Sequence, residues 1–139
     1  MSSVIRSSEL TAVLVPIGER EISGLDLVDA WAYEVLRLYR ESFGSETRES
    51  WVPEDFIAAL YTRDRLEAML SELGADRELP TVLAVDELFR SFTVDDPSRV
   101  LSAWGSDELP SEPWWWQRIP GQGPIAEELS KFAAERATD

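Results

Sequence analysis

Residues 23–42 read SGLDLVDAWAYEVLRLYRES, and this stretch decides the fold class. The Ser23 hydroxyl can accept a hydrogen bond from the first turn of a helix, and Asp26, three residues on, completes an acidic capping box. Apolar side chains then return at helical spacing along one face. They are Val28, Trp31, Ala32, Val35, Leu38 and Tyr39. The stretch therefore predicts an amphipathic helix over residues 24–42 that buries one side in a core.

Proline and glycine divide the rest of the chain in a consistent way. Proline is favoured in the first turn of a helix and glycine just past its end, so the pair marks helix boundaries. The prolines that open apolar segments are Pro53, Pro80, Pro97 and Pro124, and the glycines that follow such segments are Gly44, Gly74 and Gly105. This predicts further helices over 53–73, from Pro80 to Phe92, over 96–104 with Asp96 as its cap, and from Pro124 onward.

Three segments leave alternatives open. The apolar phase slips at residues 62–65, so the segment 53–73 could be two helices that meet there, with Thr62 as a cap. Residues 81–85 also suit a short buried strand, although we favour a helix. Residues 10–22 suit an N-terminal strand or hairpin. We expect a mainly α fold, a compact orthogonal bundle of about five helices with room for that short N-terminal strand or hairpin, and an α+β fold is the alternative.

The chain has 139 residues, which is the usual size of one domain with one core. We expect a single acidic globular domain over residues 1–139. Residues 1–8 are expected to be disordered. Residues 105–123 contain three prolines and three glycines, and we expect them to form an irregular loop rich in Trp and Pro.

The formal net charge is −14, from 27 acidic and 13 basic residues, and both halves of the chain are acidic. Such a field repels phosphate backbones and anionic membranes and accelerates encounter with a basic partner. The N-terminus does not read as a signal peptide, and no apolar run approaches the length that spans a bilayer. We therefore expect a cytoplasmic protein that binds neither nucleic acid nor membranes directly.

The sequence contains no His and no Cys, which excludes Ser-His-Asp and Cys-His catalysis and the usual zinc sites. Catalysis by carboxylates remains, and the candidate residues for it are five pairs of adjacent acids. These pairs are Glu54-Asp55, Asp86-Glu87, Asp95-Asp96, Asp107-Glu108 and Glu127-Glu128. Caps, first helical turns, polar faces and a loop explain them more simply than catalysis does. We expect no enzyme, no cofactor and no metal site.

The unusual segment is Pro113-Trp114-Trp115-Trp116-Gln117-Arg118. Three consecutive Trp side chains cannot all face inward on one regular element, because neighbours on a helix or a strand diverge. Either two of them seal the end of the core, or they form an aromatic anchor, since Trp and Arg dominate interface hot spots. The residues that we predict to bind a partner are Trp114, Trp115, Trp116, Arg118, Asp107, Glu108 and Glu112.

These features favour a non-catalytic acidic interaction protein that binds a basic protein partner. An immunity protein or inhibitor that neutralises a toxin or nuclease fits this class. The alternative is a small-molecule or peptide-binding regulatory module with a pocket lined by Trp31, Trp51 and the Trp114–Trp116 segment.

Overall fold

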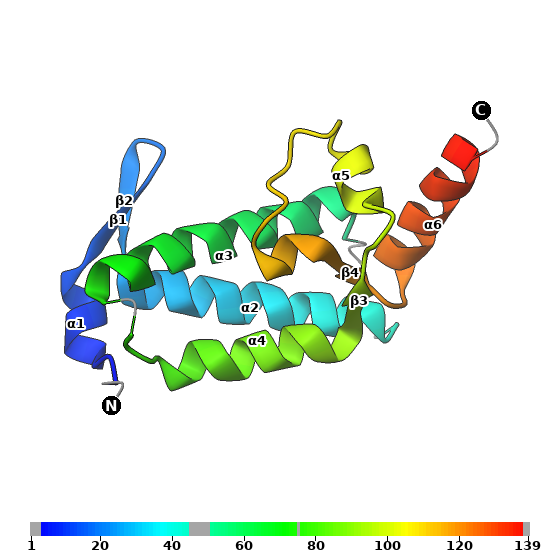
Figure 1. The fold of residues 1–139 in the computed structure, drawn as a ribbon. Coiled ribbons are helices and arrows are strands. Elements are labelled where there is room, and N and C mark those ends of the chain that lie inside the picture. Colours follow the sequence, from blue (N-terminus) through cyan, green and yellow to red (C-terminus); the bar gives the residue numbers. More distant parts are fainter. Residues whose placement is uncertain (1–3, 45–50, 75, 138–139) are drawn as a thin grey trace.

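The structure is a computed structural model, and it describes residues 4–44, 51–74 and 76–137 of the 139 (Figure 1). Helices dominate these residues, which confirms the mainly α fold with a short N-terminal hairpin. The elements are α1 (Ser7–Ala12), β1 (Leu14–Ile17), β2 (Arg20–Ser23), α2 (Gly24–Ser42), α3 (Pro53–Leu73), α4 (Pro80–Phe92), β3 (Thr93–Asp95), α5 (Val100–Trp104), the 3₁₀ helix η1 (Trp114–Gln117), β4 (Arg118–Pro120) and α6 (Pro124–Ala137).

Helix α2 is the centre of the fold. It packs against both α3 and α4. In Figure 1 helices α2, α3 and α4 lie alongside one another, with α3 running opposite to the other two, so they do not cross orthogonally as we expected. The predicted cap forms, because the N–H of Asp26 donates to the Ser23 hydroxyl at 3.1 Å. Trp31, Phe56 and Phe89 bring one fully buried ring from each of these three helices into the core.

Helix α3 is a single helix, so the alternative of two helices that meet at residues 62–65 is wrong. Thr62 is a mid-helix residue whose hydroxyl lies 3.2 Å from Glu34 Oε1 and 3.3 Å from the carbonyl of Ala58. Arg63 is buried and forms an ion pair with Asp86 of α4. The apolar phase slips here because this part of the helix presents buried polar groups to its neighbours.

The N-terminal segment is ordered from residue 4 on, which corrects the disorder expected over residues 1–8; residues 1–3 lie outside the described ranges. Ile5 is buried, and its N–H donates to the carbonyl of Glu78 at 2.8 Å. Strands β1 and β2 pair antiparallel through a two-residue turn that begins at Gly18, whose φ of +62° suits glycine. Residues 10–12 belong to α1, so the hairpin is shorter than the segment that suggested it.

Residues 96–104 are less helical than expected. Asp96 does act as a cap, since its carboxylate accepts the N–H groups of Val100 and Leu101 at 2.9 and 3.0 Å. The helix itself begins only at Val100, and Pro97 lies in the turn before it. The prediction of Asp96 as a cap is confirmed, but the helix that follows, α5, has only five residues.

The expected irregular loop over residues 105–123 contains the 3₁₀ helix η1 and strand β4. Strand β4 pairs antiparallel with β3, in the register Thr93↔Pro120, Val94↔Ile119 and Asp95↔Arg118. This pairing fastens the Trp segment to the end of α4 and leads the chain into α6 (Figure 1).

Candidate functional site

Two of the three consecutive tryptophans belong to the core. Trp115 and Trp116 are 4% and 5% exposed, and the indole N–H of each donates to Oδ1 of Asp64 at 2.8 Å. The ring of Trp116 also meets Tyr61 edge-on, with centroids 4.9 Å apart. The structure therefore places both rings in the sealing role. They are not exposed as the aromatic anchor that we predicted.

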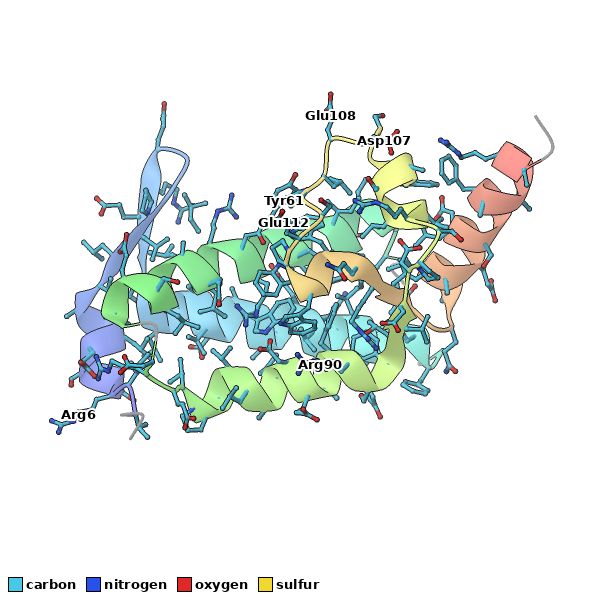
Figure 2. All side chains as sticks on the ribbon, in the orientation of Figure 1. Arg6, Tyr61, Arg90, Asp107, Glu108 and Glu112 are labelled. Atoms are coloured by element: carbon cyan, nitrogen blue, oxygen red, sulfur yellow. The ribbon has the colours of Figure 1, made fainter. Side chains whose placement is uncertain are left out.

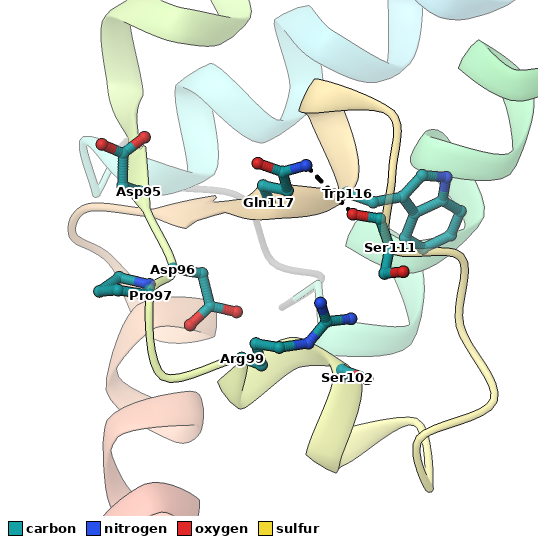
Figure 3. A pocket seen from close by; sticks show the side chains of 8 residues that line it. All are labelled: Asp95, Asp96, Pro97, Arg99, Ser102, Ser111, Trp116 and Gln117. Atoms are coloured by element: carbon teal, nitrogen blue, oxygen red, sulfur yellow. Dashed lines mark hydrogen bonds between the residues drawn. The ribbon is translucent and has the colours of Figure 1, made fainter.

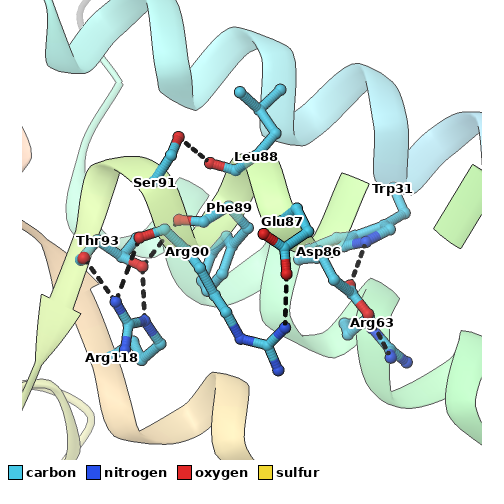
Figure 4. A network of polar contacts seen from close by, with 10 residues as sticks. All are labelled: Trp31, Arg63, Asp86, Glu87, Leu88, Phe89, Arg90, Ser91, Thr93 and Arg118. Carbon is cyan, nitrogen blue, oxygen red and sulfur yellow. Dashed lines mark hydrogen bonds and ion pairs between the residues drawn. The ribbon is translucent and has the colours of Figure 1, made fainter. Parts of the chain in front are cut away.

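Trp114 and Arg118, the other two predicted binding residues of this segment, also make contacts within the protein. Trp114 is half-buried beneath Arg90, whose guanidinium lies 3.8 Å from the ring centroid. Arg118 donates to the hydroxyl and the carbonyl of Thr93 at 2.8 and 2.6 Å (Figure 4). It also donates to Oδ1 of Asp95 at 3.0 Å. Arg118 thus holds β4 to β3, and its donors are already used.

A buried ion pair lies behind the Trp segment. The Nε and Nη2 atoms of Arg63 donate to the two carboxylate oxygens of Asp86, each at 3.0 Å, and Trp31 Nε1 donates to Oδ1 of Asp86 at 3.1 Å (Figure 4). The Arg63 guanidinium also lies 4.4 Å from the ring centroid of Trp115. The prediction that Asp86-Glu87 forms a polar helix face was wrong for Asp86, which is a core residue.

The acidic loop, residues 105–113, carries the three predicted carboxylates Asp107, Glu108 and Glu112. All three side chains are exposed, and none forms an ion pair with a described residue. Asp107 and Glu108 lie at the outer part of the loop, beyond α5 (Figure 2). The structure thus leaves all three carboxylates accessible.

The backbone of this loop is held at both ends. The N–H of Asp107 donates to the carbonyl of Ser102 at 2.7 Å, and both Ser106 and Asp107 have a φ of +61°. At the other end, the side-chain amide of Gln117 donates to the carbonyls of Ser111 and Glu112 at 3.1 and 2.9 Å. Two successive left-handed residues without a glycine are uncommon and depend on surrounding contacts to hold them. The carboxylates therefore project from a defined backbone.

A cavity of about 540 Å³ opens beside this loop. Arg99 supplies its one cationic side chain, which makes no hydrogen bond or ion pair within the described ranges and points into the space between the 96–99 turn, α5 and the η1–β4 segment (Figure 3). The acids in its wall are already engaged, Asp96 with the α5 amides and Asp95 with Arg118. The lining residues are Asp95, Asp96, Pro97, Arg99, Ser102, Ser111, Trp116 and Gln117.

The predicted Trp-lined pocket is not formed. Trp31 has no exposed surface and is bonded to Asp86, and Trp115 lies in the core. Trp51 stacks under Arg37, whose guanidinium is 5.2 Å from the ring centroid. Trp116 alone among the tryptophans lines the cavity beside the acidic loop.

A buried carboxylate lies at the end of α2. Glu41 is 4% exposed, and neither carboxylate oxygen makes a hydrogen bond with a described residue. Burial is the main cause that raises the pKa of Glu41 to about 6; the nearby amide of Ile125 offsets this in part, and the carboxylates of Asp55 and Glu127 add to the rise. Both carboxylate oxygens of Glu41 are closed off from solvent.

Among the described residues, no helix has the length and apolar character needed to cross a bilayer, and no three acidic side chains converge to hold a metal ion. No protein-family model matches the chain, and neither the curated proteins nor the solved structures include a match to it.

Proposed function

We propose that this protein is a non-catalytic binding protein that receives a basic protein partner on the acidic loop. The observation that carries the proposal is the state of Asp107, Glu108 and Glu112. Their side chains are exposed and lack ion-pair partners within the described ranges, and the backbone beneath them is tied to α5 and to Gln117.

The charge balance favours a basic partner. Even if every base paired with an acid, 27 − 13 = 14 carboxylates would stay uncompensated. Arg63 and Arg118 form ion pairs with other residues of the chain, whereas the acids of the acidic loop face solvent. A cleft or loop of one sign on a body of the same sign raises the encounter rate with an oppositely charged protein.

The ordered backbone of the loop favours binding over a purely solubilising role. A loop that is already held in place loses little conformational entropy when a partner arrives, so more of the contact energy appears as affinity. Exposed carboxylates can accept hydrogen bonds from Arg or Lys side chains, and Arg would bind in bidentate geometry. A toxin or nuclease with a basic substrate-binding surface is the partner class that fits these acids, and the protein would then be its inhibitor or immunity protein.

The first experiment identifies the partner by cross-linking it to one chosen residue of the protein. A photo-cross-linking amino acid replaces Glu108 in one variant and Glu19, in the turn of the distant β1–β2 hairpin, in the other. We expect the same basic protein to be cross-linked in cells of the natural host from position 108 and not from position 19. Equal cross-linking from both positions, or a captured partner that is acidic, contradicts the proposal.

The second experiment measures the affinity for that purified partner at low and physiological ionic strength. The surface ion pairs weaken as salt screens them, with a screening length near 8 Å at about 0.15 M. We expect the dissociation constant to rise by about tenfold or more over this range. An affinity that does not depend on salt contradicts recognition by charge.

A second candidate function rests on the cavity that contains Arg99. Its volume of about 540 Å³ suits a small ligand, and an uncommitted guanidinium in a cavity that Trp116 also lines favours a carboxylate that also carries an apolar group. Arg99 itself is held in the left-handed region, at φ +53° and ψ +46°, a strained conformation of a kind that clusters at binding sites.

This candidate is tested with a panel of small carboxylates, benzoate among them, by tryptophan fluorescence and thermal shift. We expect a saturable change that is lost in Arg99→Gln and kept in Arg20→Gln, which removes an equal charge from the hairpin. A response that survives Arg99→Gln, or no response at millimolar ligand, removes this candidate.

A further inference from the structure

The cavity beside the acidic loop shares part of its wall with the contacts that hold the loop. Ser102 lines the cavity, and its carbonyl accepts the N–H of Asp107 at 2.7 Å. Gln117 also lines the cavity, and its side-chain amide donates to the carbonyl of Ser111, a third lining residue, at 3.1 Å (Figure 3). The same amide donates to the carbonyl of Glu112 at 2.9 Å. A ligand in the cavity would therefore meet the residues that hold both ends of the loop.

Gln117 supports the loop from the side of the cavity. The nitrogen of its side-chain amide carries two hydrogens and serves two loop carbonyls, so both of its donors are used. The backbone of Gln117 is itself fixed, because its carbonyl accepts the N–H of Asp96 at 2.9 Å and it directly follows the buried Trp116. A ligand that restrains the Gln117 side chain would thus restrain the loop carbonyls bound to it.

Helix α5 connects Arg99 with the other end of the loop. The carbonyl of Arg99 accepts the N–H of Ala103 at 3.0 Å, so this residue belongs to the start of the helix. Only three positions separate Arg99 from Ser102, whose carbonyl holds Asp107. An anion bound by the Arg99 guanidinium would therefore act on the same short helix that holds the acidic loop.

We propose that this cavity is a regulatory site, and that a small carboxylate bound by Arg99 holds the acidic loop in the conformation that receives the basic partner. The inference rests on the proposed function and adds its regulation. The ligand class is an aromatic monocarboxylate, because the guanidinium of Arg99 binds the carboxylate and Trp116 offers an apolar wall.

Two effects set the direction of this regulation. A ligand that contacts Ser111 and Gln117 restricts the loop in advance, so less conformational entropy is lost when the partner binds. Its carboxylate also neutralises the charge of Arg99, which makes the potential around the loop more negative and more attractive to a basic protein. Ligand and partner should therefore strengthen each other's binding, and by the same factor, because a coupling free energy is reciprocal.

Amide hydrogen exchange, followed by NMR on the protein alone with benzoate as the probe, tests the effect on the loop. We expect saturating benzoate to slow exchange of the Asp107 amide by about threefold or more. The Glu9 amide donates to the carbonyl of Arg6 at 3.0 Å in the exposed first turn of α1 and should keep its rate. Arg99→Gln should abolish the response at Asp107, and Arg20→Gln should keep it. Benzamide, which has the ring without the charge, should have no effect.

The dissociation constant of the cross-linked basic partner, measured with and without benzoate at matched ionic strength, tests the effect on binding. We expect benzoate to lower it by about fivefold, and the partner to lower the dissociation constant of benzoate by the same factor.

The two measurements separate this inference from the proposed function. Slowed exchange at Asp107 with no basic partner on the loop would support the link between cavity and loop and would refute the proposed function. An unchanged exchange rate at Asp107 overturns the inference, whether or not benzoate binds. A partner affinity that benzoate leaves unchanged or weakens also overturns it, while the partner's place on the acidic loop stands.

Discussion

Asp64→Ala should destabilise the protein strongly, although Asp64 is a half-buried acid in the middle of a helix. One oxygen of this carboxylate accepts both indole N–H groups of Trp115 and Trp116, at 2.8 Å each. With both rings at least 95% buried, solvent has little access to the indole N–H groups once the carboxylate is removed. Each unsatisfied buried donor costs about 1–3 kcal/mol, so the loss of an acceptor for two donors should lower the free energy of unfolding by about 2–6 kcal/mol. That is a large part of a typical stability of about 5–15 kcal/mol.

Urea unfolding followed by far-UV circular dichroism measures this loss. Glu72→Ala removes an exposed acid from the same helix and should stay within about 0.5 kcal/mol of the original chain. Acrylamide quenching of tryptophan fluorescence should increase in Asp64→Ala; acrylamide is uncharged, so the acidic surface does not repel it. An Asp64→Ala protein as stable as the Glu72→Ala control would refute the assignment of the Trp segment to the core.

Three further predictions concern buried or paired charges. The pKa of Glu41, raised to about 6 chiefly by burial, makes the folded state bind its proton more tightly than the unfolded state does. Stability should therefore fall by about 1–2 kcal/mol between pH 4.5 and pH 7 relative to Glu41→Gln, as measured by urea unfolding; identical pH profiles would contradict this. The hydrogen bond from Arg77, followed by the backbone N–H of Arg6, lowers the pKa of Glu9 to about 2. Its stabilisation is thus complete above pH 4.5 and is lost as the pH falls toward 2, and an NMR titration of Glu9 with a midpoint near 4.5 would show that the pair is absent. Arg63→Met should cost about 3–5 kcal/mol, because it strands the Asp86 charge, and adding Asp86→Leu should recover part of that loss in the same unfolding assay; strictly additive losses would exclude the coupling.

Helix boundaries were the best predicted part of the fold. Local rules set them, and α2, α3, α4 and α6 begin where the cap or the proline indicated. Ser23 and Asp96 both serve as caps with the bonds that their side chains allow. Such signals lie within four or five residues of their effect, so a single sequence contains them.

Contacts between distant segments were not predicted. The pairing of β3 with β4 joins residues about 25 positions apart through only three residues each, which is too short for alternation to reveal. Helix α1 has six residues and is held by the bond from Arg77 to Glu9 and, just before the helix, by the bond from Ile5 to Glu78. Neither element has a strong pattern of its own.

The site was predicted in part for the same reason. The exposure of Asp107, Glu108 and Glu112 followed from their place in a loop rich in proline and glycine. The fate of the Trp segment depended on Asp64, which lies 51 positions before Trp115 and has no signal of its own. The break in the apolar pattern at residues 62–65 was the one sign in the sequence that this part of α3 has polar partners. A helix that buries Arg63 cannot keep a purely apolar stripe there.

The most direct test of the proposed function is the association rate constant with the cross-linked basic partner. It is compared between two charge-matched triple variants, Asp107→Asn/Glu108→Gln/Glu112→Gln in the acidic loop and Glu19→Gln/Glu21→Gln/Glu128→Gln elsewhere. Both raise the net charge by three, so any difference reports position and not total charge. We predict that the loop variant associates about tenfold more slowly and that the control changes by less than about threefold. Equal rates for the two variants would contradict the claim that the acidic loop receives the partner.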